Sequence, residues 1–580
     1  MSGFFYDFIF HLFSLVVPKY GIYQYCRKLE FSDVAERYFS AIFQFSGVFI
    51  VSYQDFPKLI SATEAAALVQ DGDTLATSGF VGIGFPEKLA IALEKRFLQE
   101  QSPQWLTLVY AAGQGDGKEK GLNHFAHEGL VRRVIGGHWG LVPALGKLAV
   151  EGKIEAYNLP QGIISHLYRD IAAGKPGLLS RVGLHTFVDP RHDGGRINAN
   201  SPESLVQLHC IGEEEFLFYK SFPITVAFLR GTTADARGNI TMEKEALPLE
   251  SLALAQAVRN SGGKVIVQVE RLTSQHRLHP SQVVIPGILV DHIVLASGDQ
   301  HFQTFAEFYN PAYSGDVRVS DHLPSDELSI RKIIARRAAL ELRDQAVVNL
   351  GIGMPESVVR VASEEKVLNQ LTLTIEPGGI GGLPAGGLSF GAVANAEAVV
   401  DQPAQFDFYD GGGLDQAFLG LAEADACGNV NVSRFGSRLA GAGGFINISQ
   451  NTREVFFLGS FFAGGVQPQI HHGEVDCQRS EGLGKFVSQV QHLTFNGAYA
   501  LSRNQRVLYI TERCVFRLQR ATDGTARLEL CELAPGVDLE RDVLRFLPFT
   551  PLIADDLRPM PAAIFRSQPM RLQLRPAVRS

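Results

Sequence analysis

Glu376 is the residue whose place in the sequence points most directly to chemistry. It follows an apolar run at residues 371–375 and precedes a glycine-rich segment at residues 377–387. Ligands of open α/β sheets bind beyond the carboxyl ends of the strands, and glycines there leave room for a substrate. Because glutamate has a reference pKa of about 4.3, its carboxylate is ionised at pH 7 and can be a nucleophile without a neighbouring base. Glu376 is therefore the candidate nucleophile, and the alternative is a solvated residue at a strand end.

An internal repeat shows that Glu376 has a counterpart of a different type. Residues 82–87 (GIGFPE) and 351–356 (GIGMPE) agree at five of six positions, as do residues 234–239 (ADARGN) and 424–429 (ADACGN). Between these pairs, Leu-Thr-Leu at 106–108 leads to Ala111, and the same tripeptide at 371–373 leads to Glu376. The three pairs occur in the same order. We interpret the chain as two related halves, of which only the second has a carboxylate at this position.

The elements that must position Glu376 are apolar, strand-like runs that alternate with helical patterns, for example at residues 224–229, 264–270 and 345–350. This alternation predicts an α/β fold with two related open sheets in tandem. Ser61 and Glu64 form a capping box that begins the leading helix of the first half. The predicted divisions are an N-terminal extension (1–54), a first half (55–300), a linker (301–327), a second half that carries the nucleophile (328–560) and a C-terminal tail (561–580).

Composition excludes some classes of partner and compartment. The formal net charge of −8 leaves no basic surface for nucleic acid. The six cysteines are scattered without a C-x-x-C pair, which indicates ordinary thiols and a cytoplasmic protein. Residues 4–17 are strongly apolar but contain Asp7 and His11, and they are shorter than the roughly 20 residues that a membrane-spanning helix needs. We expect neither a membrane span nor a secretory signal.

Missing motifs exclude other chemistries. The chain has no G-x-G-x-x-G spacing at residues 79–84, no P-loop and no G-x-S-x-G elbow. The histidines form no metal-binding pattern. His138, in Gly-Gly-His-Trp-Gly at 136–140, could line a pocket, although packing beside an aromatic residue is the commoner role.

The chain resembles the family I CoA transferases in their fused form, which includes acetate, propionate and 3-oxoacid CoA-transferases. The resemblance covers about residues 58–560 and rests on the segments 71–73, 77–80, 82–86, 158–162, 186–191 (in the stretch 185–198), 374–378 and 406–413. Ser78 replaces a glycine that is common in the family, and Thr-Ile-Glu-Pro-Gly at 374–378 departs from the common Ser-Glu-Asn-Gly. We interpret the second departure as the mark of a branch.

The resemblance implies a reaction in which Glu376 carries CoA as a glutamyl-CoA thioester while CoA passes between short-chain carboxylic acids. CoA is then a substrate, and no metal or permanently bound cofactor is expected. Each attack places negative charge on an oxygen, and glycine loops can supply N–H donors to it. The candidate oxyanion or substrate contacts are Gly113, Gln114, Gly443 and Gly444. The candidate CoA-binding loop is Gly351, Ile352, Gly353, Met354 and Pro355.

Two other interpretations stay open. An acyl-CoA hydrolase would use the same glutamate with water as the acceptor, and a non-catalytic CoA-binding protein would keep the fold without forming a covalent intermediate. We expect acyl-CoA and short-chain acids as partners, no nucleic acid, and a homo-oligomer.

Overall fold

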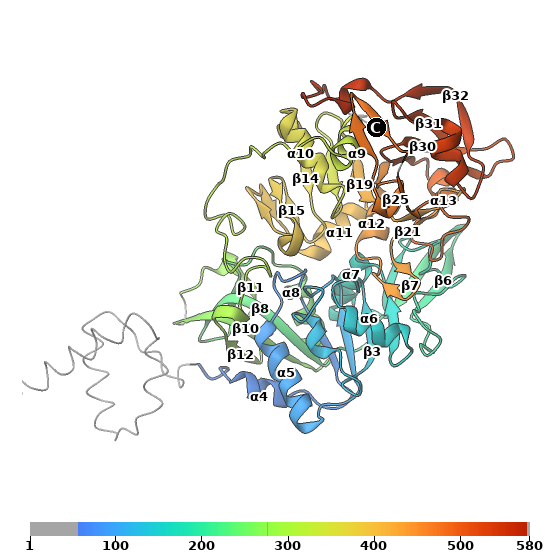
Figure 1. Ribbon diagram of the computed structural model, residues 1–580. Helices are drawn as coiled ribbons and strands as arrows, with labels where there is room; N and C mark the ends of the chain where they lie inside the picture. The colour runs from blue at the N-terminus through green and yellow to red at the C-terminus, as the bar shows by residue number, and fades with distance from the viewer. Residues whose placement is uncertain (1–55, 275–276, 479, 577–580) are drawn as a thin grey trace, which may run out of the picture. The chain divides into compact units, whose positions relative to one another are not determined.

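The computed structural model describes residues 56–274, 277–478 and 480–576, and the extension predicted at residues 1–54 lies outside them. All the elements below belong to the unit that begins at Lys58 (Figure 1). Among the helices of the described residues, none is both long enough and apolar enough for a membrane span.

A nine-stranded sheet forms the first half. Its strands are β1 (Thr74–Thr77), β2 (Leu106–Tyr110), β3 (Val131–Gly136), β4 (Glu155–Asn158), β8 (Val226–Asp235), β9 (Ile240–Thr241), β10 (Lys264–Thr273), β11 (Val283–Ile285) and β12 (His292–Leu295). The strands β4-β3-β2-β1-β8-β10-β12 run parallel in this order, and β9 and β11 add antiparallel pairs beside β8. Every residue of β2 and β8 is buried, as expected for parallel strands that are covered on both faces.

The first half also contains helices and a small antiparallel sheet. The capping box predicted at Ser61 and Glu64 is confirmed, with both of its hydrogen bonds present. The small sheet has the order β5-β7-β6 and consists of β5 (Gly177–Ser180), β6 (Val206–Ile211) and β7 (Glu214–Lys220). The helices are α4 (Ala62–Ala67), α5 (Glu87–Glu100), η2 (Leu122–Phe125), α6 (Pro143–Val150), α7 (Gln161–Ala172), α8 (Ser251–Asn260), η3 (Pro280–Gln282) and η4 (Gly298–Gln300).

A ten-stranded sheet forms the second half. Its strands are β13 (Val347–Leu350), β14 (Thr372–Thr374), β15 (Gly379–Ile380), β18 (Ala398–Val399), β19 (Gln416–Gly420), β24 (Glu454–Leu458), β29 (Arg506–Ile510), β30 (Cys514–Arg520), β31 (Ala526–Leu533) and β32 (Leu552–Pro559). The strands β14-β13-β19-β24-β29 run parallel in this order. β15 and β18 extend one edge and β30, β31 and β32 extend the other.

The second half has its own helices and several two-stranded ribbons. The helices are α9 (Ile330–Ala339), α10 (Glu356–Glu364), η5 (Leu368–Gln370), η6 (Gly387–Ser389), α11 (Gln402–Asp410), α12 (Phe445–Asn451), α13 (Gly497–Ser502), η7 (Leu539–Val543), η8 (Leu544–Phe546) and η9 (Ala562–Phe565). The ribbons pair β16 (Leu383–Pro384) with β17 (Val393–Ala394), β20 (Glu423–Ala424) with β21 (Val430–Asn431), β22 (Arg434–Phe435) with β23 (Arg438–Leu439), β25 (Phe462–Val466) with β28 (Glu481–Gly484), and β26 (Gln469–His471) with β27 (Glu474–Asp476).

The two sheets share a strand order, which confirms the predicted α/β fold with two related open-sheet domains in tandem. The parallel strands β2-β1-β8-β10-β12 of the first sheet correspond in order to β14-β13-β19-β24-β29 of the second. The repeated segment at 82–86 lies between β1 and α5, and the segment at 351–355 lies between β13 and α10. Asp235 and Asp425 make the same turn, since each carboxylate accepts backbone N–H bonds from residues two and four positions later.

The segment between the halves contains no helix or strand from residue 301 to residue 329, all of which the structure describes. It nevertheless contacts the second half, since the Thr304 and Ser389 hydroxyls are 2.8 Å apart. Beyond residue 560, Ile564 and Phe565 are buried in the core of the second half. The divisions drawn from the sequence at 300, 327 and 560 stay predictions.

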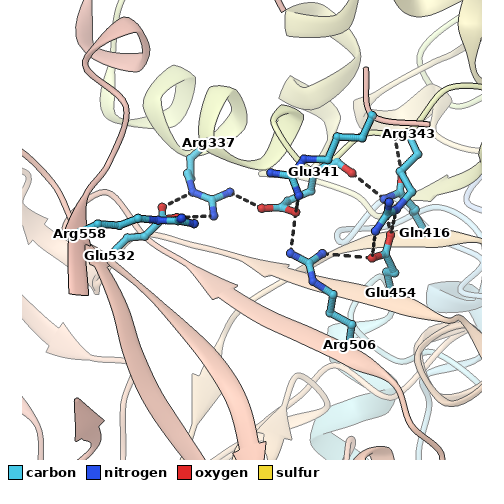
Figure 2. A network of polar contacts seen from close by, with 9 residues as sticks. Arg337, Glu341, Arg343, Gln416, Glu454, Arg506, Glu532 and Arg558 are labelled. Atoms are coloured by element: carbon cyan, nitrogen blue, oxygen red, sulfur yellow. Dashed lines mark hydrogen bonds and ion pairs between the residues drawn. The ribbon is translucent and has the colours of Figure 1, made fainter. Parts of the chain in front are cut away.

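A network of ion pairs holds α9 and the turn after it against the second sheet (Figure 2). Arg337 on α9 donates to Glu532 on β31 at 2.5 Å and to Glu341 at 2.8 Å. Arg506 on β29 then bridges Glu341 and Glu454, at 2.7 and 3.2 Å. These contacts join β24, β29 and β31 to the helix. The network also includes Arg343, Gln416 on β19 and Arg558 on β32.

Candidate active site

Glu376 lies just beyond the carboxyl end of β14, at the edge where β13 also ends. Asn349 and Thr374 are paired across these two parallel strands, so the loop that begins at Gly351 leaves the sheet beside Glu376. Glu376 is partly exposed, whereas the residues on either side of it, Ile375 and Pro377, are buried. Its carboxyl group makes no hydrogen bond to another described residue. The side chain therefore lies beyond the carboxyl ends of the strands, where open sheets bind ligands, and no described hydrogen-bond partner competes for it.

The protonation of Glu376 differs from the sequence-based expectation. Burial raises the pKa of its carboxyl to about 7, because the charged form loses hydration that no described partner replaces. The assumption of full ionisation at pH 7 is therefore wrong, and a substantial fraction of the carboxyl is protonated at that pH.

A buried polar cluster lies next to Glu376 and was not recognised from the sequence. Tyr409 on α11 donates a hydrogen bond of 2.9 Å to the Thr374 hydroxyl, and Asn349 donates to Tyr409 at 3.3 Å. Burial, with a smaller contribution from the charge of Glu376, raises the pKa of the Tyr409 hydroxyl. The cluster ties α11 to the strands β13 and β14. Nothing in a single sequence links these three positions.

The predicted pair Gly443 and Gly444 approaches Glu376 from the start of α12. A Cβ atom placed on Gly444 would lie 3.5 Å from Glu376 Cγ and 3.3 Å from Phe406 Cζ, so a side chain at this position would crowd the site. The Gly444 N–H has no acceptor among the described residues. The Gly443 N–H instead donates to the Gly137 carbonyl at 2.8 Å. Of the two glycines, only Gly444 has a free donor next to Glu376.

The predicted pair Gly113 and Gln114 follows β2 in the first half. Gly113 lies next to the ring of His138, and so does Gly443 of the second half. A Cβ atom placed on Gly113 would lie 2.5 Å from His138 Nδ1, and one placed on Gly443 would lie 3.5 Å from His138 Cδ2. The backbone N–H groups of Gly113 and Gln114 have no acceptor in the described part of the chain. No hydrogen bond joins either residue to Glu376.

The side chain of Gln114 is hydrogen-bonded to Thr77 and not to Glu376. Its amide carbonyl accepts a 2.6 Å hydrogen bond from the Thr77 hydroxyl, and its amide N–H donates to the Thr77 carbonyl at 3.1 Å. Gln114 can therefore offer its backbone N–H to a substrate, while its side chain holds the loop against β1.

Backbone hydrogen bonds join the two halves around these loops. The Trp139 N–H donates to the Ala440 carbonyl at 2.7 Å, and the Gln161 N–H donates to the Gly443 carbonyl at 2.9 Å. The side-chain amide oxygen of Asn158 also accepts from the Ala442 N–H, at 2.9 Å. These contacts bring loops that are some 300 residues apart in the sequence into one site between the halves.

The predicted CoA-binding loop lies at the end of β13. The Gly351 N–H donates to the Phe418 carbonyl at 2.9 Å, and the Gly353 N–H donates to the Glu356 carboxylate at 2.8 Å. Gly353 has a φ of +86°, which favours glycine, and no atom lies within 4 Å of where its Cβ would be. Ile352 is 56% exposed, and Met354 and Pro355 lead into α10. The loop is therefore open, and it offers an exposed apolar side chain at the edge of the sheet where β13 and β14 end.

Comparison with known proteins gives a consistent set of similarities. Residues 59–296 match the family model described as coenzyme A transferase. The chain is 45% identical to caffeate CoA-transferase of Acetobacterium woodii, over 88% of this chain and 97% of that protein. It is 41% identical to the acetate CoA-transferase YdiF of Escherichia coli strain K12, over 87% and 95%.

A solved structure extends the similarity to the fold. The acyl-CoA transferase YdiF of E. coli O157:H7, in a thioester complex with CoA, has a TM-score of 0.84 and 38% identity. The match covers 91% of this chain and 100% of that one.

Proposed function

This chain belongs to the coenzyme A transferase family, and from that premise we propose that it moves CoA between short-chain carboxylic acids through a thioester on Glu376. The observation that carries the assignment is the position of Glu376. It is a carboxylate with no described hydrogen-bond partner, at the carboxyl end of β14 and beside the free N–H of Gly444.

The proposed reaction exchanges one thioester for another in two pairs of steps. The ionised Glu376 oxygen attacks the acyl-CoA carbonyl, a C–O bond forms, the C–S bond breaks, and the CoA thiolate leaves an acyl-glutamyl anhydride. The thiolate then attacks the glutamyl carbonyl, so that the first acid departs as a carboxylate and Glu376 carries CoA. A second acid reverses both steps. Charge and atoms balance without an outside proton donor.

Backbone donors would stabilise the oxyanion that forms in each step. Gly444 is the first candidate, because this glycine lies next to the Glu376 side chain and its N–H has no acceptor among the described residues. The free N–H groups of Gly113 and Gln114 are candidates from the first half. A well-placed donor of this kind is typically worth about 3 kcal/mol of transition-state stabilisation.

CoA would bind against the loop from Gly351 to Pro355, where Ile352 offers an exposed apolar surface at the edge that Glu376 shares. The acids are proposed to be small, such as acetate, propionate or a 3-oxoacid. The relatives named above act on caffeate or acetate. The described cysteines are unpaired thiols, which supports a cytoplasmic location. We also propose a homo-oligomer.

The test is to incubate the protein with acetyl-CoA alone and digest it for mass spectrometry. The expected result is CoA attached to the peptide that contains Glu376, and loss of both adduct and transfer in Glu376→Ala. Adduct formation followed by release of CoA at the same rate with and without added acid would indicate a hydrolase instead. An unmodified Glu376 peptide in an active protein, or an adduct on Cys427, would refute the nucleophile.

A further inference from the structure

The imidazole of His138 is enclosed by glycines from both halves of the molecule. Cβ atoms placed on Gly113, Gly140 and Gly443 would lie 2.5 Å from Nδ1, 3.0 Å from Cε1 and 3.5 Å from Cδ2, respectively. A side chain at Gly113 would therefore overlap the ring. The glycines leave a slot shaped for the imidazole, and His138 remains partly exposed within it.

The contacts of the ring indicate which nitrogen carries the proton. Burial lowers the pKa of His138 to about 4, so the imidazole is neutral at pH 7. Nδ1 is buried and has no hydrogen-bond partner among the described residues. A buried N–H without an acceptor is rarer in proteins than an acceptor without a donor, so we assign the proton to Nε2. Nε2 lies toward Gly140, which is exposed. His138 then presents an N–H donor at its open edge.

His138 and Glu376 lie on either side of one short loop. Cβ atoms placed on the consecutive residues Gly443 and Gly444 would lie 3.5 Å from His138 Cδ2 and 3.5 Å from Glu376 Cγ. Both side chains are partly exposed, whereas the two glycines between them are buried. A small molecule attached to Glu376 could therefore reach the open edge of the imidazole.

We propose that His138 forms a subsite for the transferred acid, in which its Nε2–H donates a hydrogen bond to an oxygen of the acid while that acid is bound at Glu376. The inference rests on the proposed function. The ligand class is a small carboxylate, or its acyl form in the thioester and the anhydride. No bond to His138 forms or breaks, and no proton is transferred to or from it.

A neutral donor suits this position better than a charged one. An imidazolium next to Glu376 would favour the ionised carboxylate by pairing with it, and the pairing would lower its nucleophilicity. A neutral N–H leaves Glu376 unpaired and still stabilises the negative charge that develops on the acyl oxygen. The glycines that enclose the imidazole keep it neutral, but they also leave Nδ1 without a hydrogen-bond partner among the described residues.

The test compares His138→Ala with His138→Gln, because glutamine retains an N–H donor of similar reach. We expect His138→Ala to lower kcat/KM for the acid acceptor by about 100-fold, the effect of removing one oxyanion donor. His138→Gln should recover at least tenfold of this loss. The dissociation constant for CoA should change by less than twofold in both variants. His209→Ala is the control, since His209 is an exposed histidine on β6 of the same half.

The outcomes separate a substrate contact from packing. If Ala and Gln variants lose the same activity, or if both lose CoA affinity and melt at the same lower temperature, His138 only packs between the loops and the proposal is wrong. If His138→Ala does not fold, the Gln variant decides: a folded His138→Gln with a wild-type KM for the acid and a lowered kcat/KM for the acyl-CoA donor would also overturn it. Absence of the Glu376 adduct in the unmodified protein would refute the proposed function itself, whereas wild-type transfer by His138→Ala would refute this inference alone.

Discussion

The carboxyl group of Glu376 has two properties that oppose one another. Burial raises its pKa to about 7, so the folded protein holds a proton that the unfolded chain releases more readily. The same loss of hydration makes the ionised carboxylate a stronger nucleophile once it forms. Burial of this carboxyl therefore lowers the stability of the fold and raises the reactivity of the carboxylate, and both effects can be measured at this one residue.

The rate of adduct formation should depend on pH with an apparent pKa near 7. Only the ionised carboxylate attacks, so the rate should rise with pH through this value and then level off. With half-ionisation near pH 7, we expect a rate roughly tenfold lower at pH 6 than at pH 8. Rapid-quench mass spectrometry of the Glu376 peptide would measure it. A rate that is constant from pH 5.5 to pH 8 would contradict the raised pKa.

Replacing Glu376 with glutamine should stabilise the protein, and only at higher pH. The pKa in the folded state lies above the ordinary value of about 4.3, so the wild type loses stability as the pH rises from about 4.3 to 7. Glu376→Gln has no proton to lose. Its free energy of unfolding in urea should therefore be higher than that of the wild type by about 1–3 kcal/mol at pH 8, and the two should be equal near pH 4. Glu213→Gln, at an exposed glutamate, should show no such difference. Equal stabilities of wild type and Glu376→Gln at pH 8 would refute the argument.

At the scale of elements, the second sheet depends on how α9 is anchored. The network of Figure 2 places buried charges between α9 and the strands β24, β29 and β31. Glu532 is 3% exposed, while Arg558, which also donates to it, is 66% exposed. Breaking a buried pair leaves an uncompensated charge, whereas an exposed pair contributes little. The two partners of Glu532 should therefore differ sharply in their effect on stability.

Glu532→Gln should lower the free energy of unfolding by about 3 kcal/mol, because the buried guanidinium of Arg337 then keeps only Glu341 as a charged partner. Arg558→Ala, at the exposed end of the same network, should cost less than about 1 kcal/mol. Urea unfolding followed by circular dichroism would measure both variants. Similar losses in the two variants would show that burial does not set the strength of this network.

Much of the element pattern could be predicted because the repeat falls at positions that both sheets need. The segments 82–86 and 351–355 form the turn from the first parallel strand to its helix, and the Asp235 and Asp425 turns share one hydrogen-bond pattern. The edge strands β30, β31 and β32 were not predicted individually. Their pairing depends on long-range register, which has no local signal in the sequence.

At the scale of the whole molecule, the candidate site lies where loops of the two halves meet. Local sequence predicted Glu376 and the glycine loops, but not which donors are free. Gly443 donates to Gly137 in the other half, which leaves Gly444 as the free donor. Likewise, the pKa of Glu376 depends on burial by residues distant in the sequence, such as Gly444. These properties arise from tertiary contacts and could not be derived from a motif.

The contact between α7 and the second half connects the interface to Glu376. A Cβ atom placed on Gly162 would lie 2.4 Å from Asn447 Nδ2 and 2.6 Å from Phe406 Cδ1, and both of these side chains are fully buried. Phe406 also packs against Gly444, which lies next to Glu376. A methyl group at Gly162 would therefore displace Phe406, and the displacement would reach the loop that offers the free N–H.

Gly162→Ala should consequently impair transfer as well as folding. Overpacking of a buried contact typically costs about 1–3 kcal/mol, and we expect the free energy of unfolding to fall by that amount. Transfer should fall more than tenfold, because shifts of about 1 Å at a reacting group can cost 100-fold in rate. Gly146→Ala in α6 is the matched control, since its Cβ would meet nothing closer than Leu439 Cβ at 3.9 Å. Alanine is also the better helix former, by about 1 kcal/mol, so this variant should keep full activity and equal or higher stability. Steady-state transfer assays and urea unfolding of both variants would decide, and a Gly162→Ala protein with wild-type transfer would show that the α7 contact does not position the site.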